Sequence, residues 1–158
     1  MKNSFLDKEL IIVNSNASSK HEVLESLGSL MIEKGYANEN YIDGLKTREK
    51  EFATGLSVKP VGVAIPHTDS SYVKEDKIAI MTLDEPVAFE EMGGSNSVDV
   101  QLVILFALTD GDDHLKALQN IIQVIQDESF VREMVTVADK EKAYELFESK
   151  LTQLEEEA

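Results

Sequence analysis

Apolar positions recur along this chain at two spacings, and the alternation between them predicts a sequence of strands and helices. A brief apolar run at 10–13 is followed by a polar break in which Ser19 and Glu22 have capping-box spacing. A helix is expected to begin there and to stop at Gly35. Its apolar positions at helical spacing are Val23, Leu24, Leu27, Leu30, Met31 and Ile32. A second helical pattern runs from Asn40 to about Phe52.

The middle of the chain favours strands. The β-branched residues of 61–65 predict a strand that ends at Pro66, because proline cannot donate to a ladder. A polar loop is expected at 68–76, a second strand at 77–83, a turn at 84–86, a short edge strand at 87–89 and a Gly- and Ser-rich loop at 92–97. Residues 98–108 begin with alternation and become continuously apolar, which is typical of a central strand covered on both faces.

The last third reads as helical. Residues 109–113 break the chain and cap a helix with His114 in its first turn. One apolar stripe is expected on that helix, made of Leu115, Leu118, Ile121, Ile122 and Ile125. A last helix or helix pair covers 128–154, and residues from about 150 to 158 form an acidic tail that we expect to fray. With no internal repeat or linker visible, residues 1–158 are interpreted as one domain.

Composition narrows the class of protein. A length of 158 residues fits one domain, and 42% hydrophobic with 28% charged residues is typical of a soluble globule. The net charge of -15 opposes binding to nucleic acid or an anionic membrane and favours a partner with a basic surface. The absence of cysteine excludes disulfides, thiolate nucleophiles and cysteine-ligated metals. No signal-peptide pattern and no long apolar run is visible, so we expect a cytoplasmic protein.

His67 is the first candidate for chemistry, because it follows directly where the strand at 61–65 meets Pro66. Imidazole changes charge near neutral pH, which makes it a common general base, metal ligand or phosphoryl acceptor. The same position is consistent with a turn histidine that has no chemical role.

Several familiar sites are missing. Neither G-x-x-x-x-G-K-[ST] nor G-x-G-x-x-G occurs, and the glycine-rich 93–97 segment lacks the G-x-S-x-G pattern of a hydrolase. A metal-dependent hydrolase that uses His67, Asp69 and His114 as ligands remains an alternative.

His114 and Arg48 complete the candidate set. At a helix N-terminus the dipole disfavours positive charge, so His114 is expected to stay neutral and to donate an N–H to an anion. Arg48, near a helix C-terminus, would add permanent charge and a forked donor that suits phosphate oxygens. Element ends are where open α/β sheets bind ligands, so the residues could converge with His67. Equally, His114 could face solvent and Arg48 could pair with a neighbouring glutamate.

Three segments together resemble a known family. They are Thr47-Arg48-Glu49-Lys50-Glu51-Phe52-Ala53-Thr54-Gly55-Leu56, Gly62-Val63-Ala64-Ile65-Pro66-His67-Thr68 and Asp113-His114-Leu115-Lys116-Ala117-Leu118. Their order and spacing resemble the enzyme IIA domain of the phosphotransferase system, fructose/mannitol class, over nearly the whole chain, and the first segment resembles the galactitol branch. The resemblance implies an α/β fold: a single domain with a mixed β-sheet flanked by helices on both faces.

The resemblance also implies roles. Nε2 of His67 would accept a phosphoryl group from phospho-HPr and pass it to a IIB partner for uptake of a sugar or sugar alcohol. An N–H of His114 and the charge of Arg48 would stabilise that group, without a cofactor or metal. Contact with the membrane would be indirect, through a IIC permease. Relatives of this fold also act as regulators whose histidine phosphorylation controls binding to another protein, which is the alternative.

Overall fold

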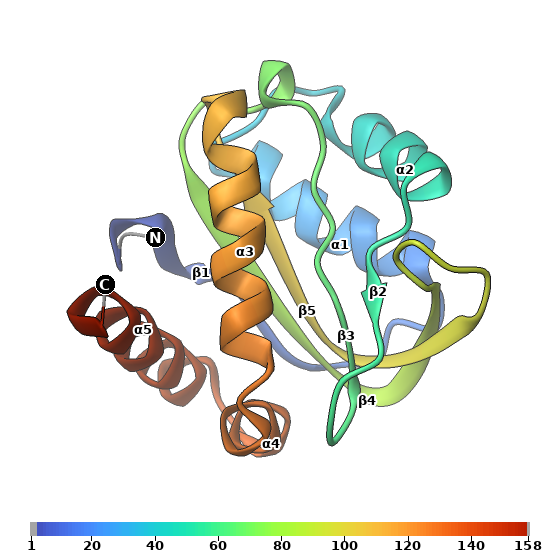
Figure 1. The fold of residues 1–158 in the computed structure, drawn as a ribbon. Coiled ribbons are helices and arrows are strands. Elements are labelled where there is room, and N and C mark those ends of the chain that lie inside the picture. Colours follow the sequence, from blue (N-terminus) through green and yellow to red (C-terminus); the bar gives the residue numbers. More distant parts are fainter. Residues whose placement is uncertain (1–2, 158) are drawn as a thin grey trace.

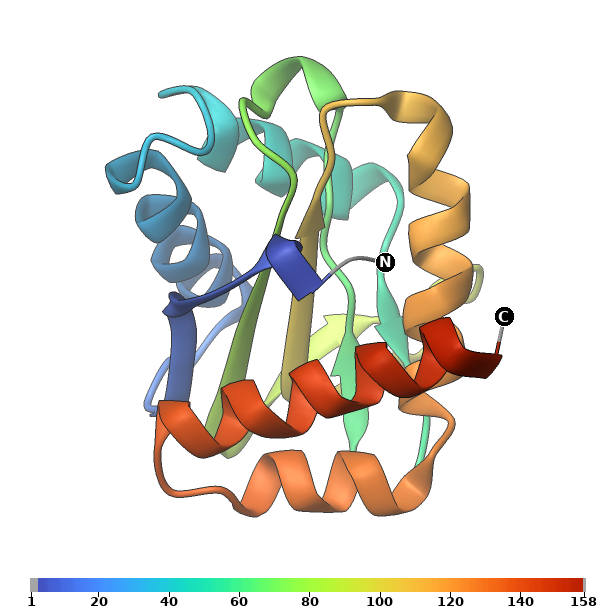
Figure 2. The same ribbon diagram turned by 90° about the vertical axis from the view of Figure 1, so that its left-hand side faces the viewer.

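A five-stranded mixed sheet forms the middle layer of the computed structural model, which describes residues 3–157, and helices cover both of its faces (Figures 1 and 2). The strands are β1 (Leu6–Ser15), β2 (Gly55–Leu56), β3 (Gly62–Ala64), β4 (Lys77–Glu90) and β5 (Ser97–Ala107), in the order β1-β4-β5-β3-β2. The helices are α1 (Lys20–Glu33), α2 (Tyr41–Glu51), α3 (His114–Ile125), α4 (Glu128–Thr136) and α5 (Lys140–Glu157), with short 3-10 turns η1 (Asn3–Phe5), η2 (Ser70–Tyr72) and η3 (Gly111–Asp113). The expected α/β fold is confirmed.

The central strand β5 separates two apolar cores. Its residues Leu102, Ile104 and Phe106 belong to the core beneath α3, α4 and α5, whereas Val103 and Leu105 belong to the core beneath α1 and α2. Successive side chains of a strand point to opposite faces of the sheet. The continuous apolar run at the end of β5 is therefore the signature of a strand buried on both sides, as the sequence predicts.

Helices α1 and α2 begin and end close to the residues that the sequence predicts. Ser19 caps α1, since its hydroxyl accepts a hydrogen bond from the Glu22 N–H at 3.2 Å. The Glu22 carboxylate reaches back to Ser18 and accepts from its N–H. Gly35 follows α1 with φ of +77°, a left-handed conformation that favours glycine.

The expected turn at 84–86 is wrong. Strand β4 continues through these residues, and its pairing with β5 is interrupted between Thr82 and Val87. Pro86 lies in this interruption, where its missing N–H costs no ladder hydrogen bond. The short strand expected at 87–89 is the end of β4, and Phe89 there pairs with Val98. The two-residue strand β2 and the turn η2 within the predicted loop were not expected.

The stripe expected on α3 is only partly right. Of its five residues, Ile121 and Ile125 are buried, Leu118 and Ile122 are partly buried, and Leu115 is 65% exposed. Ala117 and Val124 are buried as well. A step of three residues back from Ala117 leads to His114, so the helical repeat turns Leu115 away from the core.

At the C-terminal end the structure confirms a helix pair, α4 and α5. The backbone is helical as far as Glu157, so the fraying of the acidic end stays a prediction. Ala158, the last residue of that tail, lies outside the described residues. No helix within the described part of the chain is both long and apolar enough to cross a membrane.

Candidate functional site

The candidate site lies where β3 and β5 end. These strands are parallel, so their carboxyl ends meet at the same edge of the sheet, beside the start of α3 (Figure 1). His67 follows β3 after Ile65 and Pro66, and His114 opens α3. The two imidazole rings approach with centroids 6.2 Å apart and planes at 80°. The structure therefore brings together the two histidines that the sequence places on different elements.

The orientation of the His67 ring is set by one backbone hydrogen bond. Its Nδ1 lies 3.0 Å from the carbonyl oxygen of Ile65. A carbonyl oxygen only accepts, so Nδ1 carries the proton and donates. In the neutral ring, Nε2 is then the nitrogen with a free lone pair.

The surroundings of His67 favour that neutral form. Burial is the main cause that lowers the pKa of His67 below its ordinary value of 6.5. The hydrogen bond to Ile65 opposes this shift, while the positive charges of Arg48 and His114 lower the pKa further. The uncharged ring is therefore the favoured form at neutral pH, with a free lone pair on Nε2.

Phe106 lies under both histidines and was not among the residues that the sequence singled out. Its ring stacks on His67 with centroids 4.4 Å apart and planes at 21°, and it meets His114 edge-on at 5.9 Å. Its backbone N–H donates to the carbonyl of Pro66 at 3.3 Å. An aromatic residue near the carboxyl end of a central strand was the available signal, hidden in an apolar run that reads as core.

Arg48 lies in the last turn of α2. The carbon Cζ of its guanidinium group is 4.2 Å from the ring centroid of Phe52, which is 57% exposed. Its Nε is buried and has no hydrogen-bond partner among the described residues. Arg48 lines one shallow pocket with Thr68 and Asp69, the two residues after His67, and its charge is among the causes that lower the pKa of His67.

Arg48 makes none of the ion pairs found among the described residues, so pairing with Glu49 or Glu51 is not what the structure shows. The Glu49 carboxylate is buried and accepts from the N–H of Thr54 at 2.8 Å and from its hydroxyl at 2.7 Å. Burial raises the pKa of Glu49, and the bonds from Thr54 oppose that shift. Glu49 thereby holds the connection between α2 and β2, a role that the sequence did not reveal.

His114 makes one long contact. Its Nε2 lies 3.4 Å from the carbonyl oxygen of Leu108, so Nε2 is the donor there. In the neutral ring the other nitrogen, Nδ1, has no proton to donate.

The expected alternative of a metal site is not supported by the side-chain arrangement. Within residues 3–157, no group of three or more His, Asp or Glu side chains is placed to hold a metal ion. His67, Asp69 and His114 are therefore not gathered into a ligand cluster.

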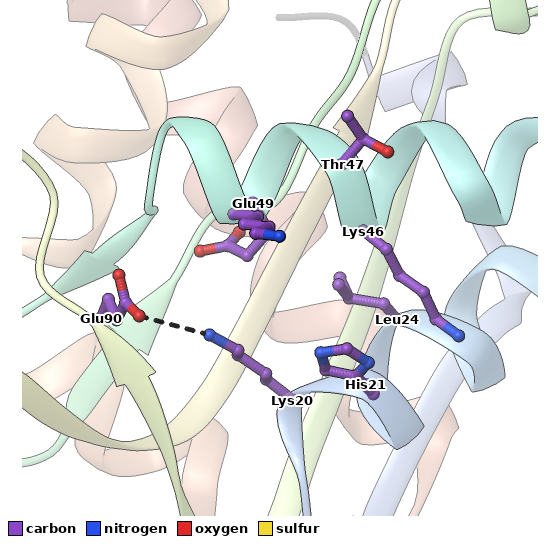
Figure 3. A pocket seen from close by; sticks show the side chains of 8 residues that line it. Lys20, His21, Leu24, Lys46, Thr47, Glu49 and Glu90 are labelled. Carbon is purple, nitrogen blue, oxygen red and sulfur yellow. Dashed lines mark ion pairs between the residues drawn. The ribbon is translucent and has the colours of Figure 1, made fainter.

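A separate pocket of about 490 Å³ lies between α1, α2 and the end of β4 (Figure 3). It is lined by Lys20, His21, Leu24, Lys46, Thr47, Glu49, Lys50 and Glu90. Figure 3 shows Lys20 turned toward Glu90, with Nζ and Oε1 3.8 Å apart. Neither His67 nor His114 lines this pocket, and charges of both signs surround it.

Comparison with known proteins points to one family. Residues 4–150 match the family model described as phosphoenolpyruvate-dependent sugar phosphotransferase system, EIIA 2. The galactitol-specific EIIA component of Escherichia coli K12 is 28% identical over 120 residues, 76% of this chain and 80% of the relative. The mannitol-specific enzyme IIA component of Halalkalibacterium halodurans is 30% identical over 141 residues, 87% of this chain and 90% of the relative.

Solved structures agree with the fold. The nitrogen regulatory protein IIA-Ntr from Neisseria meningitidis superposes with a TM-score of 0.75 at 26% identity, covering 91% of this chain and 97% of that one. The enzyme IIA in a mannitol-system complex with phosphorylated enzyme IIB from Escherichia coli has a TM-score of 0.72 at 22% identity, covering 87% and 93% of the two chains.

Proposed function

Because the chain belongs to the EIIA 2 family of the phosphoenolpyruvate-dependent sugar phosphotransferase system, and is thus a phosphotransferase component, we propose that it carries a phosphoryl group on Nε2 of His67. One observation carries the proposal. The Nδ1–H of His67 donates to the Ile65 carbonyl, which leaves Nε2 as the only ring nitrogen that can attack phosphorus.

The transfer step conserves the ring proton. The Nε2 lone pair of His67 forms a bond to the phosphorus of a phosphohistidine on HPr, and the donor's P–N bond breaks with its electron pair returning to the donor nitrogen. The Nδ1 proton stays on Nδ1, which continues to donate it in the hydrogen bond to the Ile65 carbonyl oxygen. Passing the group to a IIB partner repeats the step with His67 as the leaving group, and both bonds are P–N or similarly reactive, so the reaction runs readily in either direction.

Arg48 stabilises the charge of the phosphoryl oxygens as they move. Phosphoryl transfer passes through a loose transition state with charge on three equatorial oxygens, and a fixed guanidinium group supports such charge without reorganisation. Its buried Nε has no protein partner in the described structure, which fits a group kept available for an incoming ligand.

His114 is constrained by its contact with Leu108. To donate an N–H to the phosphoryl group, the ring either releases Leu108 and turns Nε2–H toward the phosphate, or takes a second proton on Nδ1. The 3.4 Å contact is long for a hydrogen bond, so releasing it costs little.

The rim of the site suits macromolecular partners. Phe52 and Leu115 are 57% and 65% exposed, and they adjoin Arg48 and His114. A shallow pocket of about 210 Å³ beside Arg48 is lined in part by Asp43, Glu51 and Asp69. Apolar side chains among carboxylates fit a partner with an apolar patch and basic residues, and docking there keeps water from the reacting atoms.

Membership of the family supports HPr as the donor and a IIB protein as the acceptor. The proposal places the protein in the cytoplasm, with the membrane reached only through a IIC permease. Relatives specific for galactitol and for mannitol support a sugar alcohol as the transported substrate, and the motif at 47–56 favours the galactitol branch.

A regulatory role is the second candidate, favoured by the likeness to a nitrogen regulatory protein. In that case the same phosphorylation of His67 controls binding to another protein. Transfer onward to a IIB protein separates the two functions.

The experiment that tests the proposal is incubation with phosphoenolpyruvate, enzyme I and HPr, followed by mapping of the acid-labile modification and addition of IIB from the galactitol system. The expected product is Nε2-phosphohistidine at residue 67, discharged by IIB. Modification elsewhere or none at all would overturn the proposal, and labelling without discharge to any sugar-system IIB would favour the regulatory role.

A further inference from the structure

We propose that Phe106 is a positioning residue that keeps the phosphorylated His67 ring in its protonated, imidazolium form, an inference that rests on His67 as the phosphoryl acceptor. The observations that carry it are the stacked rings, 4.4 Å apart at 21°, and the single hydrogen bond of 3.0 Å from Nδ1 to Ile65.

Phe106 itself is held firmly. It is 1% exposed, pairs with Ile78 of the neighbouring strand β4, and donates its N–H to the carbonyl of Pro66, the residue before His67. The phenyl face and the acceptor ring therefore belong to one rigid unit. The hydrogen bond to Ile65 fixes which way the His67 ring points, and the phenyl face fixes the plane in which it lies.

Transfer changes the charge of the ring. When Nε2 bonds to phosphorus while Nδ1 keeps its proton, the imidazole becomes an imidazolium carrying a phosphoryl group. This protonated form is the one that can pass the group on, because its leaving group is a neutral imidazole. Loss of the Nδ1 proton would make the leaving group an imidazolide anion, which leaves far less readily.

Two features of the site retain the Nδ1 proton. The Ile65 carbonyl accepts it, and the electron-rich face of Phe106 lies against the cationic ring, within the distance at which a cation and an aromatic face attract. Burial and the positive charges of Arg48 and His114 work against the cation, and the aromatic face offsets part of that cost. Cation–π attraction of this kind corresponds to roughly a 2- to 30-fold change in an equilibrium constant.

The test replaces Phe106 with leucine, which keeps the site apolar and removes the aromatic face. Phe89→Leu is the matched control, because Phe89 is also 1% exposed in the sheet but lies in the core on the other face, beneath α1 and α2. Each protein is phosphorylated chemically with phosphoramidate, so that no HPr is needed, and the signal of phospho-His67 is assigned by its absence in His67→Ala. The pKa of the phosphorylated ring is then titrated by 31P NMR.

Phe106→Leu is expected to lower the pKa of the phosphorylated ring, because its acid dissociation constant rises by roughly 2- to 30-fold when the aromatic face is lost, and to slow discharge to HPr at pH 8. Phe89→Leu and the wild type should agree. Phe106→Tyr, which keeps the aromatic face, should restore the wild-type titration, and Phe106→Met provides a second non-aromatic variant where leucine packs poorly. A titration that is the same in the wild type and in either non-aromatic variant would overturn the inference.

Failure of the proposed function looks different. If the wild type is phosphorylated by phosphoramidate but not by phospho-HPr, the relay proposal fails, and the titration still reports whether Phe106 holds the ring proton.

Discussion

The two sides of the candidate site are supported in different ways. On one side, His67 rests on Phe106, which is 1% exposed, and bonds to a buried backbone carbonyl. On the other, Arg48 rests on Phe52, which is 57% exposed, at the end of a helix. Both cases pair a functional side chain with an aromatic ring, but only the first ring is part of the core.

This difference implies that the orientation of the His67 ring is fixed in the free protein, whereas the surroundings of Arg48 can be completed by a docking partner. Nε2 of His67, the proposed acceptor, is oriented before any partner arrives, since the described contacts of this ring are with Ile65, Phe106 and His114 of the same chain. The guanidinium group is held by a surface contact, and a docking partner that covers Phe52 would strengthen it by excluding water. We therefore expect changes on the His67 side to alter the acceptor itself and changes on the Arg48 side to alter the rate of transfer.

The largest effect is expected at the acceptor. His67→Ala should abolish phosphoryl uptake from phospho-HPr, because no other ring nitrogen occupies this position. His21→Ala is the control, since His21 is an exposed histidine on α1 away from the two strand ends. Labelling is measured by mass spectrometry of the intact protein, together with circular dichroism to show that both variants fold. Full labelling of His67→Ala would refute the assignment.

The sequence predicted the acceptor side only in part. It placed His67 at the end of a strand because Pro66 stops the ladder, and the structure confirms that position. It could not show that Ile65 accepts from Nδ1 or that Phe106 lies beneath the ring. The bond to Ile65 is local, between residues two apart, but it leaves no pattern of residue types, whereas the contact with Phe106 depends on the pairing of β3 with β5, which are far apart in the chain. A long-range pairing of this kind leaves no local pattern.

The Arg48 side was harder to predict for another reason. Helix α2 was expected from its spacing, and its bounds agree, but Arg48 could equally have paired with an adjacent glutamate. The structure decides against this because Glu49 is used by Thr54. The expected turn at 84–86 was wrong because Asp84 and Pro86 are turn formers, and a strand interrupted in its pairing accepts the same residues.

Removing the guanidinium group should have the next largest effect. Arg48→Ala is expected to slow transfer by about 100- to 1,000-fold, the scale for loss of one preorganised group that stabilises developing charge. Arg48→Lys keeps a positive charge but loses the forked donor geometry of the guanidinium group, so its transfer rate should lie between those of the wild type and Arg48→Ala. Rapid-quench transfer from phospho-HPr measures both rates. Equal rates in all three proteins would make Arg48 peripheral to the reaction.

Variants of His114 test whether a neutral N–H donor at this position is sufficient for phosphoryl transfer. His114→Ala should slow transfer by about 10- to 1,000-fold while His67 is still labelled. His114→Gln retains N–H donors without a titratable ring, so a rate close to the wild type indicates that Nε2–H turns from Leu108 to the phosphoryl group. A rate as low as that of alanine indicates that the charge of a doubly protonated ring is needed. Unchanged kinetics in His114→Ala would remove it from the site.

The exposed aromatic ring should have a smaller effect. Phe52→Leu removes the face on which Arg48 rests and keeps an apolar side chain at the rim, so we expect transfer to slow by about 2- to 5-fold, as for a cation–π contact at an exposed site. Leu115→Ala is the comparison, because Leu115 is also exposed, adjoins His114 in the chain and has no aromatic face on which a cation could rest. If both variants slow transfer equally, Phe52 acts only through partner docking and not through Arg48.

The smallest effect is a shift in the titration of His67, and it tests whether the two sides of the site are coupled. Burial and the charge of Arg48 both lower the pKa of His67 below 6.5 in the unphosphorylated protein. Arg48→Gln removes a positive charge that opposes protonation, so the pKa should rise toward 6.5, and the ring should become protonated at a higher pH than in the wild type. NMR titration of the His67 ring measures this pKa directly. It needs no HPr, whose own histidine would titrate in a kinetic assay. Phe52→Leu keeps the charge of Arg48 and should shift the pKa less. An unchanged titration in Arg48→Gln would mean that the guanidinium group lies too far from the ring to act on it, and the two sides would then be independent.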